Sequence, residues 1–241
     1  MRLTKHGDYL YRVAHYGLIN CYLVVEDDGL SVIDTGVAGT AGLLEKAVSE
    51  LHQPVKRILL THADDDHVGG LDRLHERFPD AEVLIGAREA RLLRGDTDLE
   101  PGEAQVTPRK RRSFVKTQPT TLRQDGDRVG SLEVVASPGH TPGHLAFWDV
   151  RDGTLIAGDA LVTQGGLAVA GQMRWRFPLP HLFTWHAPTA LESAKRLAAL
   201  CPTRLAVGHG PVLEGSTEAL RRTTEAFERH LNRSGRADGR A

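Results

Sequence analysis

The sequence predicts an α/β protein, and three observations support this fold class. Strand-like runs rich in β-branched and aromatic residues open the chain, as in residues 18–36, where an Asp-Asp-Gly turn joins two of them. A segment with helical spacing of apolar residues follows at 40–53. Strand-like and helix-like segments then recur along the chain, which is typical of helices packed on sheets.

The later elements follow from the same two patterns. Leu71, Leu74 and Phe78 have helical spacing, and Pro79 stops that helix. Two further amphipathic helices are predicted at 187–200 and 216–232. Short apolar runs that end in turn residues predict the remaining strands, which lie within residues 55–63, 81–87, 132–150, 153–161 and 203–211.

Two segments show neither pattern. Residues 95–120 contain Gly, Pro, Thr and the basic run 109–112, and they predict a long loop. We interpret the basic run as a solvated loop rather than a phosphate-binding surface, although basic clusters do contact phosphates. Residues 164–186 are irregular but unusually apolar. Long loops in compact domains are often functional, so both segments are candidates for a binding site.

A length of 241 residues suits one large domain or two small ones, and we predict a single domain at 1–232 with a disordered tail at 233–241. Thirty basic residues balance 31 acidic ones, so nothing draws the whole chain to nucleic acid or a membrane. The N-terminus has no apolar signal region, and no apolar run approaches the length of a membrane span. Cys21 and Cys201 are too few for a disulfide framework. We therefore expect reduced, core or near-core thiols and a cytoplasmic protein.

The motif THADDDHVGG at 61–70 concentrates ligand-type side chains after a strand. Alternation along the chain would point His62, Asp64 and Asp66 to one side, with Asp65 on the surface or capping a helix. His67 is next to Asp66, where a helix begins. Imidazole and carboxylate ligands together suit zinc, iron or manganese. The alternative is a solvated loop in which one aspartate caps the helix.

Three isolated side chains also stand at predicted strand ends. His140 lies in a Pro-Gly turn within 137–144, Asp159 follows the next strand, and His209 lies between glycines. Such loops can aim a ligand because glycine permits unusual backbone angles. Each residue alone is more often structural, but the three together favour a metal site.

These motifs, with NCYLV at 20–24, VIDTG at 32–36, AGDA at 157–160 and GHGP at 208–211, resemble the metallo-β-lactamase superfamily in their order along the chain. The resemblance implies an αββα sandwich, in which two mixed sheets are flanked by helices, with two divalent metal ions at one edge. It places His62 and His140 at the first metal and Asp66, His67 and His209 at the second. Asp159 would bridge the two metals, and Asp34 would support the ligand loops from a buried position.

One position departs from the family pattern. The usual motif is His-x-His-x-Asp-His, and here Asp64 replaces the middle histidine. Some relatives with iron centres, the flavodiiron proteins, have a carboxylate there, so we predict Asp64 as a ligand and leave zinc, iron and manganese open. His144 is predicted to support the site rather than bind metal.

The resemblance implies a hydrolase that attacks a small ester, thioester or lactone with metal-bound hydroxide, similar to hydroxyacylglutathione hydrolases or lactonases. Asp66 would orient this nucleophile. An iron-dependent redox enzyme similar to persulfide dioxygenases is the alternative, and a nuclease is less favoured. The expected partner is a small molecule, and a homodimer through 164–186 is left open. Aromatic residues and a histidine of that segment are predicted to line the substrate cleft, with packing onto the sandwich as the alternative: Trp175, Phe177, Phe183, Trp185 and His186.

Overall fold

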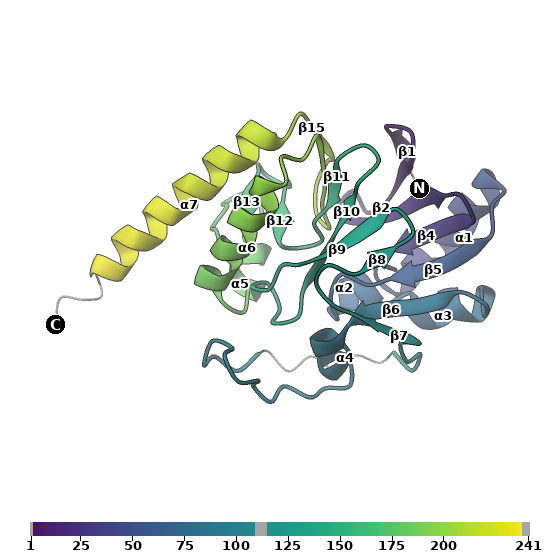
Figure 1. The fold of residues 1–241 in the computed structure, drawn as a ribbon, viewed down its shortest axis with the longest axis horizontal. Helices are drawn as coiled ribbons and strands as arrows, with labels where there is room; N and C mark the ends of the chain where they lie inside the picture. Colours follow the sequence, from purple (N-terminus) through teal and green to yellow (C-terminus); the bar gives the residue numbers. More distant parts are fainter. Residues whose placement is uncertain (1, 109–114, 238–241) are drawn as a thin grey trace.

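The computed structural model describes residues 2–108 and 115–237, and these form two β-sheets packed face to face with helices outside (Figure 1). The αββα sandwich is therefore confirmed. The basic run at 109–112 lies outside the described residues. Among the described residues, no helix combines the length and apolar composition that a membrane span requires.

The first sheet has seven strands in sequential order. Antiparallel pairs join its first four strands, and parallel pairs join the rest. Its strands are β1 (Arg2–His6), β2 (Leu10–His15), β3 (Ile19–Glu26), β4 (Gly29–Ile33), β5 (Val55–Leu59), β6 (Glu82–Gly86) and β7 (Thr121–Arg123).

The second sheet has six strands in the order β15-β14-β11-β10-β9-β8, and only β11 and β14 pair in parallel. Its strands are β8 (Arg128–Val129), β9 (Leu132–Ala136), β10 (Leu145–Asp149), β11 (Thr154–Ile156), β14 (Arg204–Ala206) and β15 (Leu213–Glu214). A separate hairpin joins β12 (Leu161–Val162) to β13 (Ala168–Val169).

Helices cover the two outer faces (Figure 1). The helices that lie between strands of the first sheet in the sequence are η1 (Ala38–Thr40), α1 (Ala41–Leu51), α2 (Asp65–Val68), α3 (Leu71–Arg77) and α4 (Ala87–Leu93). The second sheet carries α5 (Leu179–Phe183), α6 (Ala187–Ala199) and α7 (Thr217–Ala237), the last extending away from the body.

Strand alternation builds three apolar layers. In β3, Tyr22 and Val24 face the second sheet, whereas Cys21 and Leu23 face the helices of the first. Phe147 of β10 joins Tyr22 and Val24 in the central layer. A third layer lies between the second sheet and α6 and α7. This double-sided burial leaves the polar residues that end the strands at the sandwich edge.

Several predictions are corrected by the structure. Residues 164–186 are not wholly irregular, since they contain β13 and α5. Residues 233–237, the described part of the tail that we expect to be disordered, belong to α7, which ends at Ala237. Cys21 is buried as expected, but Cys201 is exposed.

Candidate metal centre

The predicted ligand residues come from four loops that follow strands of both sheets. The loop after β5 carries His62, Asp64, Asp66 and His67 and runs into α2, while the other loops follow β9, β11 and β14. Backbone hydrogen bonds join these loops, including Leu145 N–H to the Thr61 carbonyl and Gly208 N–H to the Gly158 carbonyl. The ligand residues therefore meet at one edge of the sandwich.

The first set of donor atoms belongs to His62, Asp64 and His140. Asp64 Oδ2 lies 3.3 Å from His62 Nε2 and 3.0 Å from His140 Nε2, and all three side chains are buried. Asp65 is exposed, as alternation predicts. Asp64 precedes α2, but its carboxylate makes no capping hydrogen bond to that helix. This placement favours the ligand interpretation of Asp64 over the capping one.

The second set belongs to Asp66, His67 and His209. Asp66 Oδ2 lies 3.2 Å from His209 Nε2 and 3.9 Å from His67 Nε2. Within each set, the donor atoms all lie within 4.8 Å of one another, which is the spacing that a shared ion needs.

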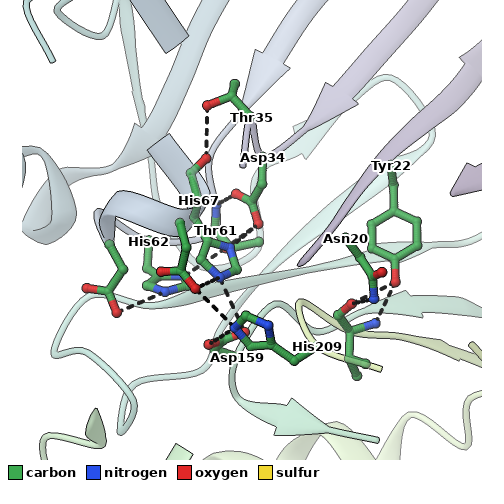
Figure 2. A network of polar contacts seen from close by, with 12 residues as sticks. Asn20, Tyr22, Asp34, Thr35, Thr61, His62, His67, Asp159 and His209 are labelled. Carbon is green, nitrogen blue, oxygen red and sulfur yellow. Dashed lines mark hydrogen bonds and ion pairs between the residues drawn. The ribbon is translucent and has the colours of Figure 1, made fainter. Parts of the chain in front are cut away.

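Asp159 lies between the two sets, as a bridging carboxylate must. Its Oδ1 is 3.4 Å from His67 Nε2. Its Oδ2 is 3.2 Å from His209 Nε2 and 3.7 Å from His140 Nε2 (Figure 2). Gly208 makes room for this carboxylate, because a Cβ there would lie 2.1 Å from Asp159 Oδ1.

The donor atoms fit divalent metal ions. His62 Nε2, His67 Nε2 and Asp159 Oδ1 are buried, and none has a hydrogen-bond partner among the described residues. Buried polar atoms without partners are costly, so the convergence of these three atoms fits a bound cation. Imidazole nitrogen with carboxylate oxygen suits zinc, iron and manganese. These residues therefore fit divalent metal ions, while the identity and number of ions stay predictions.

Two buried residues, Asp34 and His144, contact the predicted ligands from behind. Asp34, at φ 60°, accepts hydrogen bonds from the Thr61 N–H and hydroxyl at 2.8 Å each, and it lies 2.7 Å from His67 Nδ1 (Figure 2). His144 Nε2 accepts from the Asp159 N–H at 3.1 Å, and its Nδ1 lies 2.8 Å from Ser137 Oγ. Such contacts orient ligands and raise metal affinity.

Neighbouring charges shift the pKa values of the carboxylates and histidines in this centre. Burial would raise the pKa of Asp159, but His209 and His67 outweigh burial and hold that pKa well below its usual range. Burial would likewise lower the pKa of His67, but Asp159 and Asp34 raise it well above its ordinary value. Protonated histidines thus supply the positive charge that metal ions would otherwise provide.

A cleft opens over these residues in two adjoining parts that share Asp64, His140 and Phe183. The lining of the metal-side part also includes Asp66, Asp159, Leu179 and His209. We call the other part the side arm. Its lining also includes Ala63, Glu89, Leu92, Thr97, Pro108, Thr141, Pro142 and Trp185.

Only some of the five residues predicted to line the cleft do so. Phe183 and Trp185 do line it, and Phe177 packs with its ring centre 5.5 Å from that of His209. Trp175 and His186 are not among the lining residues. Trp175 is 92% exposed, and His186 caps α6 by accepting from the Thr189 N–H. An aromatic-rich sequence cannot show which of its side chains turn inward.

Sequence reasoning missed the buried Glu89 of α4. It accepts a hydrogen bond from the Ala63 N–H and another from the Gly143 N–H, each at 2.9 Å. A carboxylate beside Ala90 and four residues before Leu93, on the face that α4 buries, was the available signal. Thr97 and Pro108 also line the side arm, and they lie in the segment 95–120 that the sequence indicates as a candidate binding loop.

The sequence model of the metallo-beta-lactamase superfamily matches residues 16–209 of this chain. YobT of Bacillus subtilis (strain 168), described as an uncharacterized protein, is 45% identical over 86% of this chain and 89% of its own length. The probable metallo-hydrolase YflN of the same organism is 31% identical over 79% of this chain and 78% of its own. A hydroxyacylglutathione hydrolase of Xanthomonas euvesicatoria pv. vesicatoria (strain 85-10) is 30% identical over 82% of this chain and 63% of its own length.

Solved structures show the same fold. TTHA1623 in a di-iron-bound form superposes with a TM-score of 0.62 at 29% identity, covering 87% of this chain and 96% of that chain. A metallo-beta-lactamase from Pontibacter korlensis reaches a TM-score of 0.68 at 19% identity, covering 94% of this chain and 98% of that chain. The family model, the relatives and the shared fold show that this chain belongs to the metallo-β-lactamase superfamily.

Proposed function

We propose that this protein is a two-metal hydrolase that cleaves a small carboxylic ester, thioester or lactone. The observation that carries this proposal is the placement of Asp159 between two complete sets of donor atoms. Two relatives, a probable metallo-hydrolase and a hydroxyacylglutathione hydrolase, support hydrolysis and an ester-like substrate. We also propose that the protein is cytoplasmic and that its substrate is a small molecule.

Bound divalent ions supply hydroxide from water near neutral pH and polarise a carbonyl group. The chain would hold one ion with His62, Asp64 and His140 and the other with Asp66, His67 and His209. Asp66 is the carboxylate that an entering water meets first. Its side chain is 35% exposed, against 5% for Asp64 and 6% for Asp159. We assign Asp66 to orient the attacking water and to accept its proton.

The side arm favours a neutral, apolar group on the substrate. Its apolar lining comes from Ala63, Leu92, Pro108, Pro142, Phe183 and Trp185. Its lining, as far as the described residues show, contains the carboxyls of Asp64 and Glu89 and no Lys or Arg. An anionic group would lose its hydration there without gaining a counter-charge. We therefore propose that the acyl or alkyl part of the substrate lies in the side arm.

A redox function is the second candidate, and Asp64 is the observation that favours it. An extra carboxylate among the ligands suits harder ions such as iron or manganese. TTHA1623, a relative in structure, has been solved with two irons. Iron in the purified protein, together with oxygen consumption on a persulfide substrate, would support this candidate over hydrolysis.

The test of the hydrolase is metal analysis followed by an assay of esters, thioesters and lactones with neutral acyl groups. We expect two ions per chain and turnover of at least one class. His209→Ala should lose metal and activity while the fold is kept, because the ligands sit in loops on a rigid scaffold. His230→Ala, at an exposed position of α7, is the matched control and should retain both. Metal-free protein with full activity would overturn the proposal.

A further inference from the structure

Glu89 is a buried carboxylate that connects two ligand loops. It lies in α4, outside both sets of donor atoms, and its side chain is fully shielded from solvent. Its Oε2 accepts the Ala63 N–H at 2.9 Å, and its Oε1 accepts the Gly143 N–H at 2.9 Å. The two oxygens of one carboxylate thus take one backbone donor from each loop.

These two donors stand next to the first set of metal ligands. Ala63 lies between His62 and Asp64, and Gly143 follows His140 in the same short loop. The second set, Asp66, His67 and His209, makes no hydrogen bond to Glu89 among the described residues. The contacts of Glu89 therefore affect the spacing of the first set selectively.

The loop of His140 is pressed against α4. A Cβ at Gly143 would lie 2.6 Å from Arg88 Cβ and 2.8 Å from the Glu89 nitrogen, so only glycine permits this approach. Arg88 is itself held by Glu103, through hydrogen bonds of 2.6 and 3.1 Å. The helix therefore offers Glu89 from a rigid position, and the two loops adjust to it.

The chemistry of two converging donors requires a carboxylate. A glutamine has one acceptor oxygen, and its NH₂ group would face the second N–H donor. No ion pair to Lys or Arg accompanies Glu89 among the described residues, and its neighbour Arg88 pairs with Glu103. Burial, together with the charge of Asp64, raises the pKa of Glu89 to about 7. A buried acid without a cation costs stability, so a role in the site explains it better than a role in folding.

We propose that Glu89 is a positioning residue of the first metal site, which sets the distance between the loop of His62 and Asp64 and the loop of His140. The proposal rests on the two-metal function proposed above. It assigns Glu89 to the first site, as the contact of Asp34 with His67 assigns Asp34 to the second. Each site would then have its own buried carboxylate behind the ligands.

The test compares Glu89→Gln with wild type by titrating metal-free protein with Co²⁺ and recording the ligand-field spectrum and the number of ions bound. Wild type should bind two ions. In Glu89→Gln one ion should bind about 10–100-fold more weakly, the range found when groups behind metal ligands are removed. The absorption of the other ion should persist. Asp34→Asn should weaken the other ion more strongly, because Asp34 contacts His67 directly and the loop of His62 only through Thr61. The two variants should therefore differ in which part of the spectrum they lose most.

Glu26→Gln is the matched control. Glu26 is also buried and accepts from the Ser131 N–H at 3.1 Å and hydroxyl at 2.9 Å, but within the described part of the chain none of its hydrogen bonds involves a ligand loop. The Glu26→Gln variant should have a lower unfolding temperature, and its affinity for each of the two Co²⁺ ions should be unchanged. If Glu89→Gln does not fold, Glu89→Asp keeps both acceptor oxygens on a shorter side chain and should weaken the same ion to a smaller degree.

Three results would overturn the proposal: unchanged binding of both ions by the Glu89 variants, equal weakening of both ions, or the same effect in Glu26→Gln. Wild-type protein that binds a single ion would instead overturn the two-metal function. In that case Glu89 keeps its role only if Glu89→Gln weakens that single ion more than Asp34→Asn does.

Discussion

Asp34 and His67 form a fully buried contact in which the carboxylate Oδ2 lies 2.7 Å from the imidazole Nδ1. Because Asp34 contacts Nδ1, the Nε2 of His67 points toward Asp66 and His209, the other members of the second set. Asp34 also anchors the loop after β5 by accepting hydrogen bonds from Thr61. Asp34 therefore determines both the orientation of one ligand and the start of the motif that carries four of them.

Replacing Asp34 by Asn should weaken the second metal ion by about 10–100-fold, because an amide no longer stabilises one orientation of His67. The free energy of unfolding of the metal-free protein should fall by about 1–3 kcal/mol, since buried donors lose an acceptor. Zinc titration and urea unfolding measure the two effects. Asp28→Asn, in an exposed pair with Arg57, should change neither appreciably. Unchanged zinc affinity would show that Asp34 does not act through His67.

Metal binding should release protons. Burial lowers the pKa of His209, but Asp159 and Asp66 outweigh it and raise that pKa to about 10. At neutral pH, below this pKa, the imidazole of the metal-free protein carries a proton that an ion must displace. We therefore expect the apparent zinc affinity to rise at least about tenfold per pH unit on the way up to that pKa. Calorimetry in buffers of different ionisation enthalpy measures the released proton, and buffer-independent heats would contradict the prediction.

Asp64 should influence the choice of metal. Asp64→His removes one negative charge from the site, so zinc should gain affinity relative to manganese and iron. Bound water should also lose its proton at lower pH, which moves the rising limb of the pH–rate profile to lower pH. Competition between metals and a pH series measure these effects. Asp65→His, at the exposed neighbouring position, is the control and should match wild type. If Asp64→His also matched wild type, Asp64 would be no ligand.

The side arm should select the acyl group. Leu92→Trp would fill the arm and raise KM for longer acyl chains by about tenfold or more, because each buried methylene contributes about 0.8 kcal/mol. Acetyl substrates should be much less affected. Trp175→Ala, at a side chain that is 92% exposed, should leave the whole series unchanged. An equal loss for short and long chains in Leu92→Trp would place the acyl group elsewhere.

The sequence by itself determined the fold class and the candidate ligands. Local chemistry carries that information, because alternation along a strand fixes which of His62, Asp64 and Asp65 share a side. Glycines around His209 indicate a loop that can aim a side chain, and helical spacing identifies α1, α3, α6 and α7. The αββα sandwich followed from the resemblance of the ordered motifs to the metallo-β-lactamase superfamily and not from any local pattern.

Only the tertiary structure decided how these residues meet. Asp159 approaches His67 because the two sheets pack face to face, and no local pattern encodes a contact across the sandwich edge. The role of Glu89 depends on two backbone donors from distant loops, and backbone donors leave no trace in the sequence. The orientations of Trp175 and Trp185 differ for the same reason, since both are aromatic residues of one segment and only packing against neighbouring loops separates exposed from lining positions.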